Sequence, residues 1–163
     1  MEGSVAQRTV AVLAEIVRAL DSETAVDARL RALGLALTES FDADRCIISR
    51  VAEGVITAVG GHALGAAGTR AYARLPAGRG IVGRVAREGR IERVDDVLHD
   101  PDYFAAIALT RSELAVPVVH AGRVGAVLYL EANRLAAFTP DDEEVLAAVA
   151  RHLAGDLGRL GLG

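Results

Sequence analysis

Glycines and an arginine between Gly78 and Gly83 form the pattern with the clearest capacity to bind a ligand. Glycines let a bound group approach the backbone, and free N–H groups at the start of a helix favour a phosphate or carboxylate. A tight turn with close packing of helix on sheet explains the same glycines. The spacing lacks the full dinucleotide-binding fingerprint. The candidate ligand-binding residues of this segment are Gly78, Arg79, Gly80, Ile81 and Val82.

Four aspartates follow within a short polar stretch, Asp95, Asp96, Asp100 and Asp102, and Tyr103 ends it. Carboxylates this close together could hold a metal ion or exchange protons. Such a run is also typical of a solvent-exposed turn whose side chains cap the backbone. Because a turn explains all four aspartates, we assign no metal site and no catalytic residue.

Arg111 and Ser112 stand where a strand is expected to begin. A guanidinium group at that place could pair with an anionic group of a ligand, or it could be a loop arginine in water. The four histidines form no HExxH motif and no paired spacing. A serine–histidine–aspartate triad cannot be inferred, because proximity in space is not visible in a sequence.

One cysteine and no lysine exclude several kinds of chemistry. Without lysine there is no Schiff base and no phosphate-binding lysine of the P-loop type. With one cysteine there is no internal disulfide, no CxxC pair and no multi-cysteine zinc site. Strand alternation puts Cys46 beside Ile47 and Ile48 in a core or pocket wall, so we expect a buried, inert thiol.

Composition predicts one globular domain. The chain has 163 residues, 52% of them hydrophobic and 25% charged, and a net charge of −4. An acidic chain with scattered arginines has no general attraction for nucleic acid. No apolar run is long enough for a membrane span, and the N-terminus does not resemble a signal peptide. We expect a location in the cytoplasm of a bacterium, and the alanine- and arginine-rich, lysine-free composition suggests a GC-rich genome.

Helical periodicity marks both ends of the chain. Over residues 5–20 a heptad-like apolar stripe is formed by Ala6, Val10, Leu13, Val17 and Leu20. We predict that residues 1–21 form a dimerisation helix and that a second helix, capped by Ser22 or Thr24, follows. Thr139, then Pro140 and three acidic residues, predict the start of a final helix.

Between these helices the apolar period is that of β-strands. We expect two hairpins, 46–51 with 55–59 and 112–120 with 123–131, the second joined by a tight Ala121-Gly122 turn. Shorter strands are expected near 72–75 and 91–94, and a short helix over about 80–89. Pro117 favours an edge position or a bulge. Helices segregated from an antiparallel sheet predict an α+β domain over residues 22–160.

Three stretches in this order resemble the GAF domain family. They are Gly78-Arg-Gly-Ile-Val-Gly with the aspartates after it, Ser112-Glu-Leu-Ala-Val-Pro with Gly122-Arg-Val-Gly-Ala-Val-Leu-Tyr-Leu, and Phe138-Thr-Pro-Asp-Asp-Glu. The Asp44-Arg45-Cys46 strand opening fits as well. The resemblance implies a central antiparallel sheet of five or six strands, with the N- and C-terminal helices on one face. The opposite face, with its loops and short helices, would enclose a ligand pocket.

Site residues follow from the resemblance together with the patterns above. To the glycine-rich segment the pocket would add Asp95, Asp96, Tyr103, Arg111 and Ser112. Asn133-Arg134, Phe138 and Asp142-Glu143 resemble the motif of GAF domains that bind cyclic nucleotides, with arginine in place of lysine. That likeness implies a structural ion pair between Arg134 and Asp142. It leaves a cyclic nucleotide open as ligand, while haem is disfavoured.

The function expected from the sequence is a non-enzymatic regulatory domain that binds a small molecule and dimerises in bacterial signal transduction. Its partners would be the ligand, a second copy and a signalling effector domain or protein. Two alternatives stay open. One is a GAF-fold enzyme such as a free methionine sulfoxide reductase, which the single cysteine disfavours. The other is a dimerisation module without a ligand.

Overall fold

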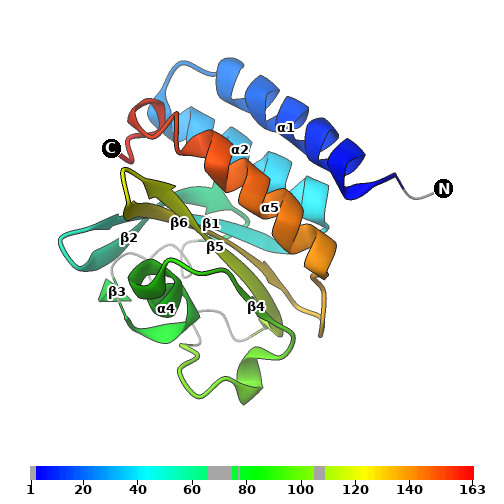
Figure 1. Ribbon diagram of the computed structural model, residues 1–163, viewed down its shortest axis with the longest axis vertical. Coiled ribbons are helices and arrows are strands. Elements are labelled where there is room, and N and C mark those ends of the chain that lie inside the picture. The colour runs from blue at the N-terminus through cyan, green and yellow to red at the C-terminus, as the bar shows by residue number, and fades with distance from the viewer. Residues whose placement is uncertain (1–2, 66–74, 77, 105–108) are drawn as a thin grey trace.

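The computed structural model describes residues 3–65, 75–76, 78–104 and 109–163 and has helices on both faces of one antiparallel sheet (Figure 1). The helices are α1 (Val5–Asp21), α2 (Val26–Phe41), α4 (Gly80–Glu88) and α5 (Pro140–Leu153), with short 3-10 turns η1 (Val97–His99) and η2 (Gly158–Leu160). The strands are β1 (Arg45–Ala52), β2 (Val55–His62), β3 (Leu75–Pro76), β4 (Glu92–Val94), β5 (Ser112–His120) and β6 (Arg123–Ala132). Their order in the sheet is β3-β2-β1-β6-β5-β4. The predicted α+β fold is confirmed.

Four layers result from this order. Helices α2 and α5 pack on one face of the sheet, and α1 lies over both of them as an outer layer (Figure 1). Helix α4 packs on the opposite face, against β5 and β6. None of the described helices is both long enough and apolar enough to cross a membrane.

Helix starts follow the local sequence in one case and depart from it in another. Thr139 caps α5 as predicted, and its hydroxyl accepts a hydrogen bond from the Asp142 N–H at 3.2 Å. Helix α2, however, begins after Ala25 and has no side-chain cap. The prediction that Ser22 or Thr24 caps this helix was wrong, because Ser22 ends α1 and donates its hydroxyl to the Ala19 carbonyl.

The buried stripe of α1 is not the one expected. Val12, Ile16 and Leu20 are buried between α2 and α5, whereas Val10 is 68% exposed and Val17 is 38% exposed. Two apolar stripes run along this helix, and the one spaced by four residues fits the groove between the underlying helices. Of the expected stripe, Ala6, Val10 and Val17 are exposed, whereas Leu13 is partly buried against the core and Leu20 is shared with the buried stripe. Dimerisation through residues 1–21 therefore stays a prediction.

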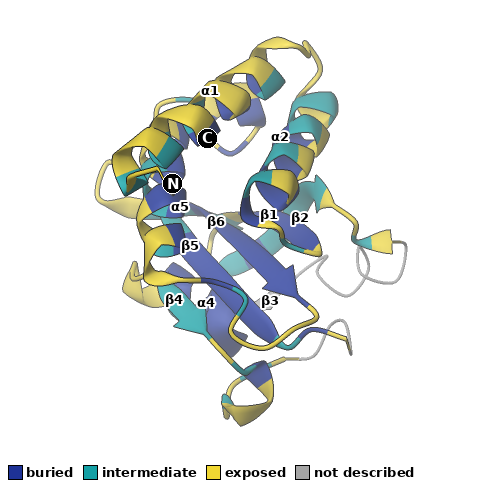
Figure 2. Cartoon of the chain, turned by 90° about the vertical axis from the view of Figure 1, so that its right-hand side faces the viewer, coloured by how far each residue is buried: buried dark blue, intermediate teal, exposed yellow. Residues whose placement is uncertain are grey.

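An apolar core lies on each face of the sheet, and the central strands between them are largely buried (Figure 2). Cys46, Ile48 and Leu128 point to the core under the helices. Ile47 and Tyr129 point to the second core, against α4. Since successive side chains in a strand face opposite ways, neighbours in the sequence belong to different environments.

The expected hairpins are present. Ala121 and Gly122 join β5 to β6 with positive φ angles of 49° and 75°, as a tight turn requires. Pro117 lies beyond the end of β4, which pairs only with residues 113–115, so no strand on that side needs its missing N–H. The strand expected near 72–75 lies outside the described residues except for its last position, which belongs to β3.

Candidate functional site

A pocket opens between the first turn of α4 and the sheet. It has about 320 Å³ of empty space, its open mouth included, of which about 20 Å³ can be reached by the centre of a water-sized molecule. The described residues that line it are Arg79, Gly80, Ile81, Val82, Tyr103, Phe104, Glu113, Tyr129 and Glu131. One wall is therefore backbone and apolar side chains, and the other carries two carboxyl groups.

The two carboxyl groups lie directly across from each other on adjacent strands. Glu113 of β5 is paired in register with Glu131 of β6, and Glu131 with Arg45 of β1. Arg45 Nε is 3.0 Å from Glu131 Oε2, and the Thr110 hydroxyl donates to the same oxygen at 2.8 Å. Arg45 Nη2 also donates to Thr110 Oγ1 and Asn133 Oδ1, at 2.8 and 2.6 Å. The guanidinium group of Arg45 thus pairs with Glu131 alone of the two acids.

Glu113 has the less favourable surroundings of the two acids. It is only 3% exposed, and its Oε1 has no hydrogen-bond partner among the described residues. Burial, and after it the negative charges of Glu131 and Asp100, raises the pKa of Glu113 well above its usual range. The carboxyl group therefore keeps its proton to a higher pH than an exposed glutamate.

This raised pKa predicts a pH-dependent stability. Between the usual carboxyl pKa of the unfolded chain and the raised folded value, the folded protein holds a proton that the unfolded chain has lost. The free energy of unfolding therefore falls as pH rises through that window, by at most about 1.4 kcal/mol per pH unit from this group. Glu113→Gln is expected to match the parent near pH ~4 and to exceed it at neutral pH in urea unfolding. Equal stability of both proteins at every pH would contradict a raised pKa for Glu113.

Two tyrosines complete the polar part of the pocket. Burial raises the pKa of Tyr103 to about 12, and it raises that of Tyr129 as well. Both phenol groups therefore stay protonated near neutral pH and can donate hydrogen bonds. Thr110 lies near the phenol group of Tyr103, and Ser49 of β1 lies near that of Tyr129.

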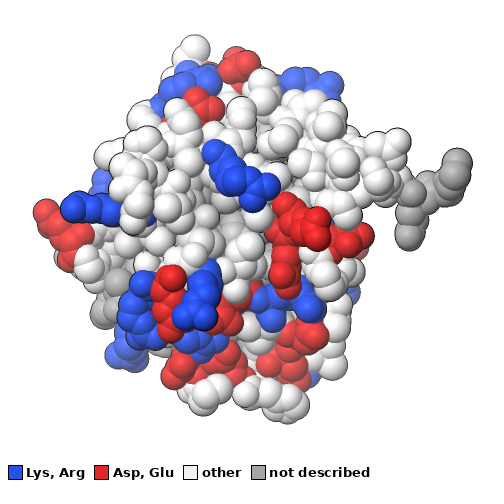
Figure 3. All heavy atoms as spheres, viewed as in Figure 1, with Lys and Arg blue, Asp and Glu red and all other residues white. Residues whose placement is uncertain are grey.

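Arg84 of α4 forms hydrogen bonds to the segment just before Tyr103 and Phe104, the two aromatic residues that line the pocket. It holds Asp100 through two hydrogen bonds of 2.9 and 2.6 Å and also bonds to Glu92 and Asp102. The same hydrogen bonds lower the pKa of Asp100. Positive and negative side chains are accordingly interleaved over the part of the molecule with α4 and β4 (Figure 3).

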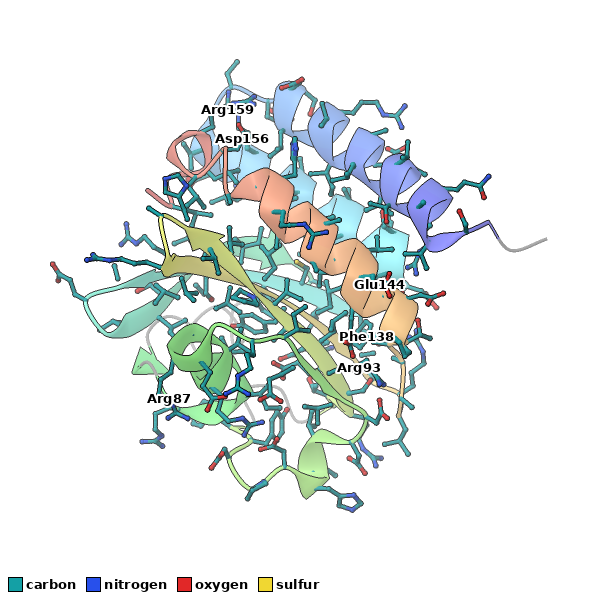
Figure 4. All side chains as sticks on the ribbon, viewed as in Figure 1. Arg87, Arg93, Phe138, Glu144, Asp156 and Arg159 are labelled. Carbon is teal, nitrogen blue, oxygen red and sulfur yellow. The ribbon has the colours of Figure 1, made fainter. Side chains whose placement is uncertain are left out.

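Arg93 ties this region to the helical layer. From β4 its Nε donates to Glu143 at 2.6 Å, and its Nη1 donates to the carbonyl of Phe138 at 3.4 Å, at the start of α5 (Figure 4). The edge strand beside the pocket is thereby fixed to the helix on the opposite face of the sheet.

A family model described as GAF domain matches residues 25–157. The chain belongs to the GAF domain family. The GAF domain resemblance in the sequence is thus confirmed over most of the chain.

Relatives of this GAF domain include enzymes. Protein YtsP of Bacillus subtilis (strain 168) is 33% identical over 86 residues, 53% of each chain. A free methionine-R-sulfoxide reductase of Escherichia coli (strain K12) is 29% identical over 86 residues, 53% of this chain and 52% of the relative. The chain matches about half the length of these curated relatives. The structure of free methionine-R-sulfoxide reductase from Neisseria meningitidis, in complex with its substrate, has a TM-score of 0.79 and 26% identity, covering 99% of this chain and 93% of that one.

These relatives overturn the expected function. The prediction of a non-enzymatic regulatory domain in signal transduction was wrong in its main statement, because reductases share both sequence and fold with this GAF domain. The alternative named beside it, a GAF-fold enzyme of the free methionine sulfoxide reductase kind, has the better support. Enzyme activity is therefore compatible with the family relationship.

The structure brings five of the predicted site residues together in the pocket: Arg79, Gly80, Ile81, Val82 and Tyr103. The others are not among its lining residues. Gly78 turns before α4, Asp95 pairs with Arg93, and Asp96 caps η1 and pairs with Arg111 at 3.2 Å. Ser112 is buried, with its hydroxyl donating to the Arg134 carbonyl at 2.7 Å. The run of aspartates therefore pairs with arginines and caps turns.

Sequence reasoning missed the most distinctive part of the site, Glu113, Glu131, Tyr129 and Phe104. A signal was available for the two glutamates, since each interrupts an otherwise apolar strand. A charged residue in such a strand is rare unless it has a partner. Their position opposite each other follows only from the register between β5 and β6.

The expected ion pair between Arg134 and Asp142 is replaced by two others. Asp142 pairs with Arg8 of α1 at 2.6 Å, and Arg134 pairs with Asp42 at 3.3 Å. Asp142 also accepts from Thr139 as part of the helix cap, which turns its carboxylate toward α1. Arg134 lies beside the end of α2 and bonds to the Asp42 carbonyl as well.

Cys46 is fully buried, as predicted, and points to the core under the helices rather than to the pocket. Burial raises the pKa of its thiol, so the reactive thiolate is disfavoured. The neighbouring residue Ile47 faces the pocket side instead. The sheet itself therefore separates the thiol from the candidate site.

Proposed function

We propose that this GAF domain binds a free amino acid of the methionine sulfoxide class in the pocket under α4 and serves its reduction. The observation that carries the proposal is the pair of buried carboxyl groups, Glu113 and Glu131, facing the first turn of α4 across the pocket. The sequence and fold likeness to free methionine-R-sulfoxide reductases supports the same class of ligand.

The two walls suit the two ends of an amino acid. The carboxyl pair attracts an ammonium group, and the buried Glu113 Oε1 has no hydrogen-bond partner among the described residues. On the other side Arg79 precedes α4 without capping it by a side-chain hydrogen bond, so N–H groups of the first turn and its guanidinium group favour the carboxylate. Ile81 and Phe104 offer apolar contact to the side chain.

Reduction in this pocket needs a thiol from outside the chain, because Cys46 is buried on the other side of the sheet. Conversion of the sulfoxide to the sulfide takes two electrons and two protons. We propose that an external dithiol supplies both: its two thiols form a disulfide, and the sulfoxide oxygen leaves as water with their two protons. The protein would bind the sulfoxide and orient its sulfur toward a thiol group of the dithiol.

Calorimetric titration with L-methionine (R)-sulfoxide tests the recognition. The analogue without the amino group is the matched control ligand, and it is expected to bind about tenfold more weakly or worse, a loss of about 1.4 kcal/mol or more. Glu113→Gln is expected to reduce the preference for the amino compound. Equal affinity for both compounds, or no binding, would contradict the proposal.

Turnover is tested separately. Methionine formed from the sulfoxide in the presence of dithiothreitol is measured by chromatography, with the protein-free reaction as baseline. The parent and Cys46→Ser are expected to be equally active, because the thiol does not face the pocket. Binding without turnover above the baseline would reject the enzymatic part and keep the recognition.

A further inference from the structure

Three buried charged residues form one row across the sheet on the pocket side. Glu113 on β5, Glu131 on β6 and Arg45 on β1 are neighbours in register, and they are 3%, 2% and 6% exposed. Like charges directly opposite each other in a sheet are destabilising. With two acids and one base in the row, only one of the two carboxyl groups can be ionised without leaving a net negative charge.

Hydrogen bonds make the two acids unequal. Glu131 Oε2 accepts from both Arg45 and Thr110, so a negative charge on Glu131 is compensated. Glu113 Oε1 has no such donor among the described residues. In a low-dielectric setting an uncompensated carboxylate costs far more than a compensated one.

The other groups that act on Glu113 do not change this order. The acids that oppose its ionisation besides Glu131 are Asp100 and Glu92, and the cation that favours it is Arg84. Arg84, however, is already shared among Glu92, Asp100 and Asp102. Among the described residues that line the pocket, Tyr103 and Tyr129 remain neutral near pH 7, and Arg79 lies on the opposite wall.

We infer that Arg45 is a positioning residue that pairs with Glu131 and thereby leaves Glu113 as the carboxyl group that releases its proton when a cationic ligand binds. The empty pocket then carries no net charge from this row. When an ammonium group binds, Glu113 loses its proton and the row gains one negative charge. The ligand part of this inference rests on the proposed function, whereas the protonation part does not.

Infrared titration of the ligand-free protein tests the protonation. The parent is expected to show a protonated carboxyl band at pH 7 that Glu113→Gln removes. Arg45→Gln is expected to add a second band from Glu131, while Arg45→Lys, which keeps the charge, is expected to add none. A parent band that survives Glu113→Gln, or an unchanged spectrum in folded Arg45→Gln, would overturn the inference.

Thr110→Val provides a second variant if Arg45→Gln does not fold. It removes one of the two donors to Glu131 and keeps the guanidinium group, so the protonated fraction of Glu131 is expected to rise less but in the same direction. Circular dichroism confirms the fold of each variant. No change in the Glu131 signal would mean that these donors serve the fold alone.

Titration of the parent with L-methionine (R)-sulfoxide, in two buffers of different ionisation enthalpy at pH 7, measures the exchanged proton. Release of up to one proton per ligand is expected for the parent and none for Glu113→Gln. Binding of the sulfoxide to the parent without proton release would overturn the exchange. Failure of the sulfoxide to bind would reject the proposed function, and the infrared result would still decide the protonation.

Discussion

Replacing Glu131 with leucine is expected to lower the free energy of unfolding by about 3–5 kcal/mol, measured by urea unfolding at pH 7. The variant leaves the guanidinium group of Arg45, which is 6% exposed, without its carboxylate partner. A buried charge that has lost its counter-ion is among the few single changes with effects of this size. Asn133 and Thr110 accept hydrogen bonds from Arg45, but neither carries a negative charge.

The double variant Arg45→Met with Glu131→Leu is the matched control. Replacing both members of a buried ion pair with apolar residues of similar volume is often neutral, so most of the lost stability is expected to return. The double-mutant cycle therefore gives a coupling energy of several kcal/mol. Additive losses in the double variant would show that packing, and not the charge, causes the instability.

The second large effect is expected from Gly83→Ala, with a loss of about 1–3 kcal/mol in the free energy of unfolding. A Cβ at this position would lie 2.6 Å from the carbonyl carbon of Gly78 and 2.8 Å from its nitrogen. Backbone atoms cannot rotate out of the way as a flexible side chain can. The hydrogen bond of 3.1 Å from the Gly78 N–H to the Gly83 carbonyl would be strained in the same variant.

Because this turn carries Arg79 and the first turn of α4, Gly83→Ala is also expected to weaken the binding of L-methionine (R)-sulfoxide in calorimetric titration. Gly158→Ala is the matched control, since a Cβ there meets no atom within 4 Å. Its stability and binding are expected to stay within about 0.5 kcal/mol of the parent. Equal behaviour of the two alanine variants would contradict the steric argument.

Gly83 also bears on the two explanations of the glycine-rich segment. Its lack of a side chain serves the close approach of two backbone stretches, as the packing explanation requires. Gly80, three residues earlier, lines the pocket. The same segment therefore forms the turn and lines the pocket, while its binding of a ligand stays a prediction.

The local sequence determined the features that depend on a few neighbouring residues. The cap at Thr139, the Ala121-Gly122 hairpin and the burial of Cys46 all follow from turn chemistry, helix caps and strand alternation. Together with the order of three motifs they also determined the GAF domain fold. Each of these patterns spans only a few residues, so its physical cause is complete within the sequence.

Tertiary structure alone decided the partners of the charged residues and with them the character of the pocket. Glu113, Glu131 and Arg45 come from strands far apart in the chain, and only the register of the sheet puts them in one row. Asp142 likewise meets Arg8 rather than Arg134, since α1 packs across the start of α5. A charge pairs with whatever lies nearest in space, and for residues on different elements the sequence spacing does not give that distance.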